Sequence, residues 1–369
     1  IDGEAGDDII FGDHGVIDQV AGTLRMATTG MVTQIRTSQT TRGLDDTIEG
    51  GSGNDIVLAG LGSDQITDSA GDNILFGDHG IIDYVSDDGD ISDIDVIRST
   101  ATNLGGNDSI ITADGTNVVV GGWGSDILNA QTGTNIIFGD AGEILASVVA
   151  APQIAGLAMT LSTVRTIDPA IGAADTIVTG DGGSVIFGGV ASDTVTTGNG
   201  TNIVVGDSGA LTVGTGSGNL GNIPLELLTL TTSDINIGSG DLITTGLGED
   251  IVLGGAGGDT ISTGGAGGNS VSDIILGDHG FINWVNVGDA STDFAREIET
   301  TDVTTGGDDT ITSGAGNDLI MGGTGSDRIL SGAGNDLVLG DHGRLAGDID
   351  ETALPLHTGT LPFDVTAIW

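Results

Sequence analysis

Aspartates recur at a fixed spacing near the C-terminal end of the sequence. Gly307–Leu345 contains three nine-residue units, Ser313–Met321, Gly322–Leu330 and Ser331–Leu339, each reading small-Gly-x-Gly-x-Asp-x-apolar-x. Carboxylate oxygens and backbone carbonyls of a glycine turn are the ligands that Ca²⁺ favours. Zn²⁺ and copper prefer His or Cys, and the sequence has five His and no Cys. The spacing therefore predicts a calcium site at the sixth place of the unit.

The same unit specifies a turn followed by a short strand. Gly-x-Gly-x-Asp makes a tight turn because Gly readily takes positive φ, and x-apolar-x makes a strand with one inward side chain. Two units complete a coil, and the next coil stacks about 4.8 Å further along. Asp309 then lies over Asp327, and Asp318 lies over Asp336 on the opposite edge. Stacked carboxylates repel each other unless a dication lies between them.

This pattern resembles the GGxGxDxUx nonapeptide of the RTX (repeats-in-toxin) family of secreted bacterial proteins. The resemblance extends over a little more than half of the chain. It implies a calcium-binding parallel β-roll, as found in giant secreted adhesins and structural repeat proteins. It also implies export of the unfolded chain through a type I secretion channel to the extracellular space or cell surface.

The units are grouped in six blocks, each closed by Gly-Asp. The closing residues are Asp13, Asp78, Asp140, Asp207, Asp278 and Asp341. A repeat of about 65 residues that contains a nine-residue repeat is typical of a solenoid. We therefore predict an all-β parallel β-roll (β-solenoid). Its super-repeats are expected at 1–42, 43–104, 105–173, 174–239, 240–306 and 307–369.

The sixth-place residues form two edges of unequal charge. The first edge comprises Asp46, Asp64, Asp108, Asp126, Asp175, Asp193, Asp241, Asp259, Asp309 and Asp327. The second edge comprises Asp55, Asn73, Asn117, Asn135, Ser184, Asn202, Asp250, Asp273, Asp318 and Asp336. The incomplete first block adds Asp8 as a candidate ligand. We expect calcium along the whole first edge and, on the second edge, mainly in blocks five and six. In blocks three and four, the second edge is expected to use Asn and Ser hydrogen bonds or weaker ions.

The closing aspartates have two interpretations. Asp341 follows Asp327 by less than one coil, so it reaches the next turn of the first edge and is a candidate last ligand of the ion row. The alternative is that each closing Asp caps backbone amides of the turn. A His follows four of these aspartates, but Ala141 and Ser208 replace it in two blocks. That replacement favours a His that bonds locally over a catalytic or ligating one.

Linkers of about 20–30 residues separate the blocks, for example Asp18–Arg42 and Asp83–Leu104. They contain all five prolines and many Thr and β-branched residues, which favours strands. We expect each linker to leave the roll as an extended arm or hairpin and to return. Because the linkers vary more than the blocks, we also expect copies to associate through these arms. A short helix is possible only at Leu225–Leu230.

Composition narrows the classes of partner. The chain has 369 residues, 53 acidic against 8 basic residues, and a net charge of −45. All the basic residues are Arg, so nucleic acid and anionic membrane would be repelled. No signal peptide or membrane span is visible, and the chain begins and ends within repeats, as an excerpt of a longer array would.

The repeats favour a structural function over an enzymatic one. No Ser or Cys nucleophile recurs beside the Asp-His pairs, so we expect no catalytic residues and no cofactor besides Ca²⁺. The leading hypothesis is a calcium-dependent extracellular rod, filament or adhesin stalk. The alternatives are a calcium-folded roll that assists secretion of an attached enzyme, and an ice- or sugar-binding module, which would need a flat regular face.

Overall fold

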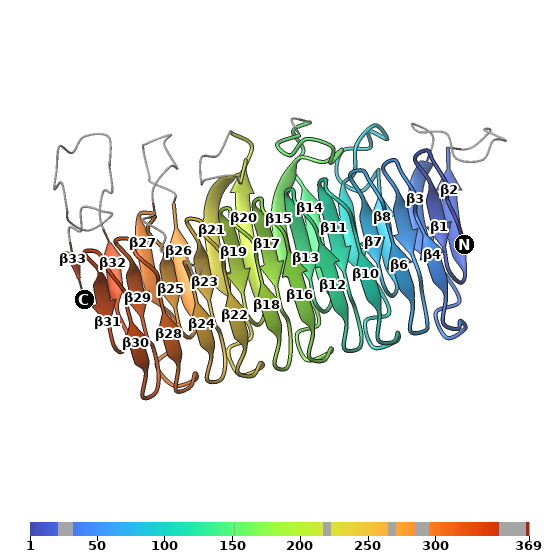
Figure 1. The fold of residues 1–369 in the computed structure, drawn as a ribbon. Coiled ribbons are helices and arrows are strands. Elements are labelled where there is room, and N and C mark those ends of the chain that lie inside the picture. The colour runs from blue at the N-terminus through green and yellow to red at the C-terminus, as the bar shows by residue number, and fades with distance from the viewer. Residues whose placement is uncertain are drawn as a thin grey trace.

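The computed structural model describes residues 1–20, 32–150, 152–216, 223–264, 271–284 and 295–346, and the backbone of 367–368. Within these residues, every regular element is a β-strand. The strands follow one another along one long axis and form three sheets, each of which runs the length of the molecule (Figure 1). Two parallel sheets make the predicted β-roll. A third, antiparallel sheet covers one of them.

The middle sheet is parallel, and its strands carry consecutive buried residues. It is formed in spatial order by β1 (Ile9–Phe11), β5 (Ile56–Leu58), β7 (Ile74–Phe76), β11 (Asn117–Val120), β13 (Asn135–Phe138), β17 (Ser184–Phe187), β19 (Asn202–Val205), β23 (Ile251–Leu253), β25 (Ile274–Leu276), β29 (Leu319–Met321) and β31 (Leu337–Leu339). Every residue of β7, β13 and β17 is buried. Such runs are expected of a sheet covered on both faces.

The outer sheet is also parallel, but only the central residue of most of its strands is buried. It is formed by β30 (Arg328–Leu330), β28 (Thr310–Thr312), β24 (Thr260–Ser262), β22 (Leu242–Thr244), β18 (Thr194–Thr196), β16 (Thr176–Thr179), β12 (Ile127–Ala130), β10 (Ser109–Ile111), β6 (Gln65–Thr67) and β4 (Thr47–Glu49). Ile48 pairs with Ile66, which confirms the eighteen-residue register. These inward residues and the middle sheet's Val57 and Leu75 belong to one apolar core.

The linkers build the third sheet, called here the linker sheet. Its strands are β2 (Gly15–Gln19), β3 (Val32–Thr37), β8 (Gly80–Asp83), β9 (Val96–Ser99), β14 (Gly142–Ala146), β15 (Leu161–Thr166), β20 (Gly209–Gly214), β21 (Glu226–Thr232), β26 (Gly280–Asn283), β27 (Glu297–Thr300), β32 (Arg344–Ala346) and β33 (Ala367–Ile368). Each pair from β2–β3 to β26–β27 is the expected hairpin. Neighbouring hairpins also pair with each other, so these strands lie on the roll instead of standing apart from it.

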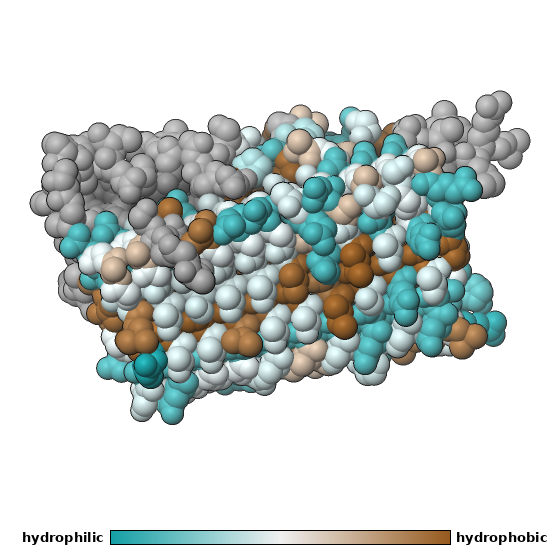
Figure 2. Space-filling model, in the orientation of Figure 1, coloured by the Kyte–Doolittle hydropathy of each residue, from teal (hydrophilic) through white to brown (hydrophobic). Residues whose placement is uncertain are grey.

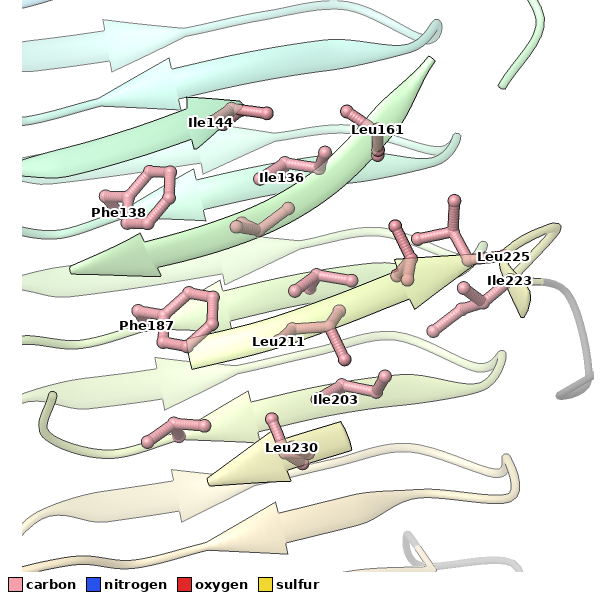
Figure 3. Close-up of a cluster of buried hydrophobic side chains, with 14 of the residues drawn as sticks. Ile136, Phe138, Ile144, Leu161, Phe187, Ile203, Leu211, Ile223, Leu225 and Leu230 are labelled. Carbon is pink, nitrogen blue, oxygen red and sulfur yellow. The ribbon is translucent and has the colours of Figure 1, made fainter. Parts of the chain in front are cut away.

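Apolar packing holds the linker sheet on the middle sheet. Phe138 and Phe187 stack with ring centroids 5.4 Å apart, and Ile144 and Leu211 of the linker sheet belong to the same buried cluster (Figure 3). The helix considered at Leu225–Leu230 is wrong. That segment runs into strand β21, whose Leu230 is buried in the cluster, and this tertiary burial overrides the local pattern.

A glycine stands two residues after each closing aspartate, and close packing explains why it is a glycine. A Cβ placed on Gly142 would lie 2.3 Å from a ring carbon of Phe138, and one on Gly80 would lie 2.8 Å from the ring of Phe76. The chain turns here from the middle sheet into the linker sheet, directly over the aromatic side chain. Only a residue without a side chain allows that close approach.

Candidate metal centre

The first-edge aspartates stand directly before the outer-sheet strands and form a continuous ladder. The backbone N–H of Asp46 donates to Oδ1 of Asp64 at 2.7 Å, and that of Asp108 donates to Oδ1 of Asp126 at 2.7 Å. The same bond joins every neighbouring pair from Asp46 to Asp327, at 2.7–3.0 Å. The predicted stacking of these carboxylates is therefore confirmed.

The ladder also crosses the boundaries between blocks. Asp64 donates to Asp108 over a sequence separation of 44 residues, and Asp126 donates to Asp175 over 49 residues, both at 2.7 Å. The sequence predicted stacking only between aspartates of the same block. The blocks are continuous in space because each linker leaves and returns on the side of the linker sheet.

The second carboxylate oxygen of these residues is buried and points into the turn. Among the described residues, Oδ2 has no hydrogen-bond partner in Asp64, Asp108, Asp126, Asp175, Asp193, Asp241, Asp259, Asp309 and Asp327. Burying an anionic oxygen without a partner destabilises the folded chain by roughly several kcal/mol. A row of such oxygens therefore requires bound protons or cations.

Backbone carbonyls converge on the same places. A Cβ on Gly121 would lie 2.4 Å from Oδ2 of Asp126 and 2.3 Å from the carbonyl oxygen of Gly139. The same pairing of an Asp Oδ2 with a neighbouring carbonyl oxygen occurs at Gly12, Gly77, Gly139, Gly188, Gly206, Gly254, Gly277 and Gly322. A carboxylate oxygen and a carbonyl oxygen in one glycine-lined gap are a donor set that suits Ca²⁺.

Electrostatics show what the ladder costs in the absence of a cation. Burial raises the pKa of Asp193 to about 10, and the carboxylates of Asp241 and Asp175 add to the rise. Burial and Asp126 raise the pKa of Asp108 to about 9. At neutral pH these groups would hold protons in the folded chain unless a metal ion replaced them.

The second edge has the same register with different chemistry. At its N-terminal end, the N–H of Asp8 donates to Oδ1 of Asp55 at 2.8 Å, and Asp55 donates to Asn73 at 2.9 Å. Further along, the side-chain amide of Asn73 donates to Oδ1 of Asn117 at 3.0 Å, and that of Asn117 donates to Asn135 at 3.1 Å. The expected Asn hydrogen bonding in block three is confirmed.

Block four meets that expectation at one of its two places, because the side-chain amide of Asn202 donates to Oδ1 of Asp250 at 2.9 Å, whereas Ser184 does not meet it. The Oγ of Ser184 is buried and has no hydrogen-bond partner within the described part of the chain. Blocks five and six return to aspartate. Asp250 then donates to Oδ1 of Asp273 at 3.0 Å, and Asp318 donates to Asp336 at 3.1 Å. The Oδ2 atoms of Asp250 and Asp318 are buried, and no described residue bonds them, as on the first edge.

The closing aspartates lie beside the first edge and bond backbone amides of two successive turns. Asp78 accepts from the N–H of Gly106 at 3.1 Å and from that of Trp123 at 2.5 Å. Similar pairs of amides are bonded by Asp13, Asp140, Asp207 and Asp278. This geometry corresponds to the capping interpretation. A ligand role for these residues, including Asp341, stays a prediction.

Two of the histidines that follow closing aspartates bond backbone carbonyls of the preceding linker, and neither contact is local in the sequence. The Nε2 of His79 lies 3.0 Å from the carbonyl oxygen of Thr40, and that of His279 lies 2.9 Å from the carbonyl oxygen of Ile235. Burial lowers the pKa of both imidazoles, so these side chains tie the linker to the turn as neutral groups.

Two acidic features were missed from the sequence. The fifth place of the unit forms its own ladder, in which Asn54 donates its N–H to Oδ1 of Asp7 at 2.8 Å and Ser63 donates to Asp45 at 3.0 Å. The recurrence of Asp or Asn before the sixth place was the available signal. In the second linker, carboxylate oxygens of Asp88, Asp93 and Asp95 lie within 4.8 Å of one another.

Comparison with known proteins agrees with this geometry. A family model described as the RTX calcium-binding nonapeptide repeat matches residues 1–15, 45–66, 59–80, 104–128, 120–143, 171–210, 238–261 and 303–338. These ranges cover more than half of the chain. The chain belongs to the RTX calcium-binding repeat family. No curated protein and no solved structure matches it.

Membership of the RTX repeat family establishes the ion and the general class of protein. RTX repeats bind Ca²⁺, so the chain is a calcium-binding β-roll. Such repeats are typical of secreted proteins and are typically non-catalytic. None of the described residues forms a helix that is long and apolar enough to cross a membrane.

Proposed function

We propose that this chain is a segment of a calcium-dependent extracellular structural rod, such as a filament or adhesin stalk. The observation that carries the proposal is the unbroken first-edge ladder, which runs from Asp46 to Asp327 through nine successive hydrogen bonds. A row of ligands along the whole described roll supports a role in stiffness and length. A single binding or catalytic site would need only a local cluster.

In this proposal, each ion is held by Oδ2 of first-edge aspartates and by the carbonyl oxygens of the glycine turns. On the second edge, the holders are Asp250, Asp273, Asp318 and Asp336. Bound calcium supplies positive charge between carboxylates that would otherwise repel, and it joins successive coils. The chain's own part is to present these oxygens at one spacing and to exclude water from them.

Folding is then coupled to ion binding. A site formed from stacked coils does not exist in the unfolded chain, so binding free energy becomes folding free energy. Extracellular calcium modules bind at about 10⁻⁴–10⁻³ M. The chain would stay unfolded at cytosolic calcium, which suits export through a secretion channel, and would fold outside the cell. The expectation that copies associate through the linker arms stays part of this proposal.

Electron microscopy of the material with and without a calcium chelator tests the proposal. We expect extended rods or filaments in calcium that disappear after chelation and return when calcium is restored. Rods that survive chelation, or compact particles with a globular head as the working part, would contradict a calcium-dependent structural rod.

A further inference from the structure

The exposed face of the outer sheet is built from two straight rows of side chains. Each strand places one residue on either side of its buried central residue, and parallel pairing keeps these residues in register. One row is Thr47, Gln65, Ser109, Ile127, Thr176, Thr194, Leu242, Thr260, Thr310 and Arg328. The other row is Glu49, Thr67, Ile111, Asn129, Val178, Thr196, Thr244, Ser262, Thr312 and Leu330. We call this surface the threonine face.

The threonine face is almost free of charge on a chain whose net charge is −45. Of its residues, Glu49 and Arg328 are charged, and they stand on the two end strands, β4 and β30. Figure 2 shows pale and brown atoms in a band along the length of the molecule over these strands, with teal gathered toward its margins. Elsewhere, like charges oppose the approach of a second acidic chain.

Apolar side chains stand exposed among the threonines. Ile127 is 55% exposed, Leu242 47%, Leu330 46% and Ile111 41%. Threonine adds a methyl group and a hydroxyl, which both donates and accepts hydrogen bonds. Ten strands spaced about 4.8 Å apart give a face about 48 Å long, and two such faces bury about 1,000 Å² in all. That area is at the lower end for a specific interface.

We propose that the threonine face binds the threonine face of a second copy of this chain, with the two rods antiparallel. A two-fold axis along the strand direction places β4 of one copy over β30 of the other. Glu49 then lies over Leu330 of the second copy and diagonally opposite its Arg328, two residues along the strand, at both ends of the interface. Long side chains reach such a diagonal neighbour, and the uncharged rows meet between the two ends. The parallel arrangement would instead bring each charge near its own kind.

The other broad face is less suited to this role. On the exposed side of the linker sheet, Arg165 already forms an ion pair with Glu143, as does Arg98 at 3.6 Å. Near the C-terminal end of the linker sheet, Arg344 pairs with Glu297 and with Glu299. Charges that are paired within one chain would have to be desolvated or exchanged before a partner could dock there.

This inference deepens the proposed rod function by naming a lateral contact, and it rests on that function because calcium must first fold the roll. Circular dichroism in calcium reports folding alone, and analytical ultracentrifugation reports association. A chain that does not fold with calcium contradicts the rod function. A folded chain that stays monomeric contradicts the inference and the expected association through the linker arms, but it leaves the calcium-dependent rod standing.

The test is sedimentation equilibrium of the chain in saturating calcium, from about 0.1 to 100 µM. We expect a dimer with a micromolar dissociation constant. The double variant Thr194→Asp with Thr196→Asp places four carboxylates at the centre of the interface, and it should raise the dissociation constant more than about a hundredfold. The matched control, Thr229→Asp with Thr231→Asp, makes the same change on β21 of the linker sheet and should leave it unchanged.

Charge exchange tests the antiparallel arrangement. Glu49→Arg alone and Arg328→Glu alone should each weaken the dimer about tenfold, and the two together should restore it. A wild-type monomer at about 100 µM overturns the proposal, whether or not it binds ice or polysaccharide. It is also overturned if the β21 control weakens association as much as the β18 variant, or if the combined exchange does not restore the dimer.

Discussion

The two turn edges of the roll share one backbone register but differ in charge. On both edges, a sixth-place side-chain oxygen accepts from the backbone N–H of the residue one coil away, at 2.7 Å from Asp108 to Asp126 and at 2.9 Å from Asp55 to Asn73. Asn therefore satisfies the geometry as Asp does. The comparison shows that the register does not require negative charge, because Asn73 and Ser184 hold the same place in the stack as the aspartates do.

The edges also differ in chain continuity. After each second coil, the chain leaves the middle sheet, forms a linker hairpin and returns just before a first-edge aspartate, as from Phe76 to Asp108. Alternate turns of the first edge are thus not closed by the covalent chain. Closing aspartates such as Asp78 bond one amide on the returning side, that of Gly106, and one amide of the next turn, that of Trp123. A row of ions on this edge would clamp the turns that the linkers interrupt.

Removal of calcium at neutral pH is expected to have the largest effect, and it tests whether hydrogen bonding alone can hold the two edges. We expect loss of most β-structure, because the first-edge carboxylates repel and the narrow core does not compensate for them. Far-UV circular dichroism during titration with a chelator measures this. Readdition of calcium should restore the signal, and magnesium at the same concentration should not. A β-signal that persists without calcium would show that hydrogen bonding suffices on both edges.

Acidification should partly replace calcium. Burial raises the pKa of Asp259 to about 10 and that of Asp108 to about 9, against about 3.9 in an unfolded chain. The folded calcium-free state therefore holds protons that the unfolded state has released. Its stability is greatest below about pH 4 and falls as pH rises toward 10. On the second edge, burial raises the pKa of Asp250 to about 6 and that of Asp273 to about 7.

The measurement is the β-signal of the calcium-free chain between pH 4 and pH 9. We expect more β-structure at pH 4 than at pH 9 in the calcium-free chain. In limiting calcium we expect more β-structure at pH 9, because at pH 4 protons compete with the ion for the carboxylates. A calcium-free chain that is better folded at pH 9 than at pH 4 would contradict the assigned burial of these carboxylates.

A single substitution on each edge sharpens the comparison. Asp193→Asn keeps the shape of the side chain and removes one charge from the first edge. At a calcium concentration a hundred times the dissociation constant, each lost site removes about 2.7 kcal/mol of unfolding free energy. Calcium titration calorimetry and thermal unfolding measure both effects. Ser184→Ala on the second edge is the control, and it should cost little because its buried Oγ has no hydrogen-bond partner among the described residues. Equal losses in the two variants would contradict the difference between the edges.

The smallest expected effect is a gain. Asn117→Asp together with Asn135→Asp gives block three an acidic pair on the second edge, where the amides now hydrogen-bond at 3.1 Å. We expect one more bound calcium ion per chain and a lower stability when calcium is absent. Ion counting by mass spectrometry of the folded chain would reveal the change. An unchanged count would show that the second edge lacks carbonyl oxygens in the right place.

Much of the roll could be predicted from the sequence because its rules are local. The nine-residue spacing places Asp46 one coil from Asp64, and the buried Ile48 over Ile66 follows from the same period. The difference in charge between the two edges could also be predicted, since it depends only on the residue type at the sixth place of each unit. The fifth-place ladder was within reach by the same reasoning, because Asp7 and Asn54 occupy equivalent places.

The linkers could not be predicted as well, because their structure depends on partners far away in the sequence. Local pattern allowed a helix at Leu225–Leu230, where packing of the buried leucines into the core shared with the middle sheet makes β21 a strand of the linker sheet. The local pattern predicted the hairpins, but it did not predict that neighbouring hairpins pair with each other, as Val164 pairs with Leu211. Nor did it give the hydrogen bond from Asp64 to Asp108 across a whole linker.

The sequence by itself therefore determined the coil, its register and the positions of its acidic oxygens, since a period of nine residues fixes neighbours one coil apart. Tertiary structure decided that the hairpins close into a third sheet, that the ladder is continuous, and that the threonines align on one exposed face. Those features require long loops to close and separate blocks to meet. Their free energy comes from buried contacts between distant segments, which no local spacing records.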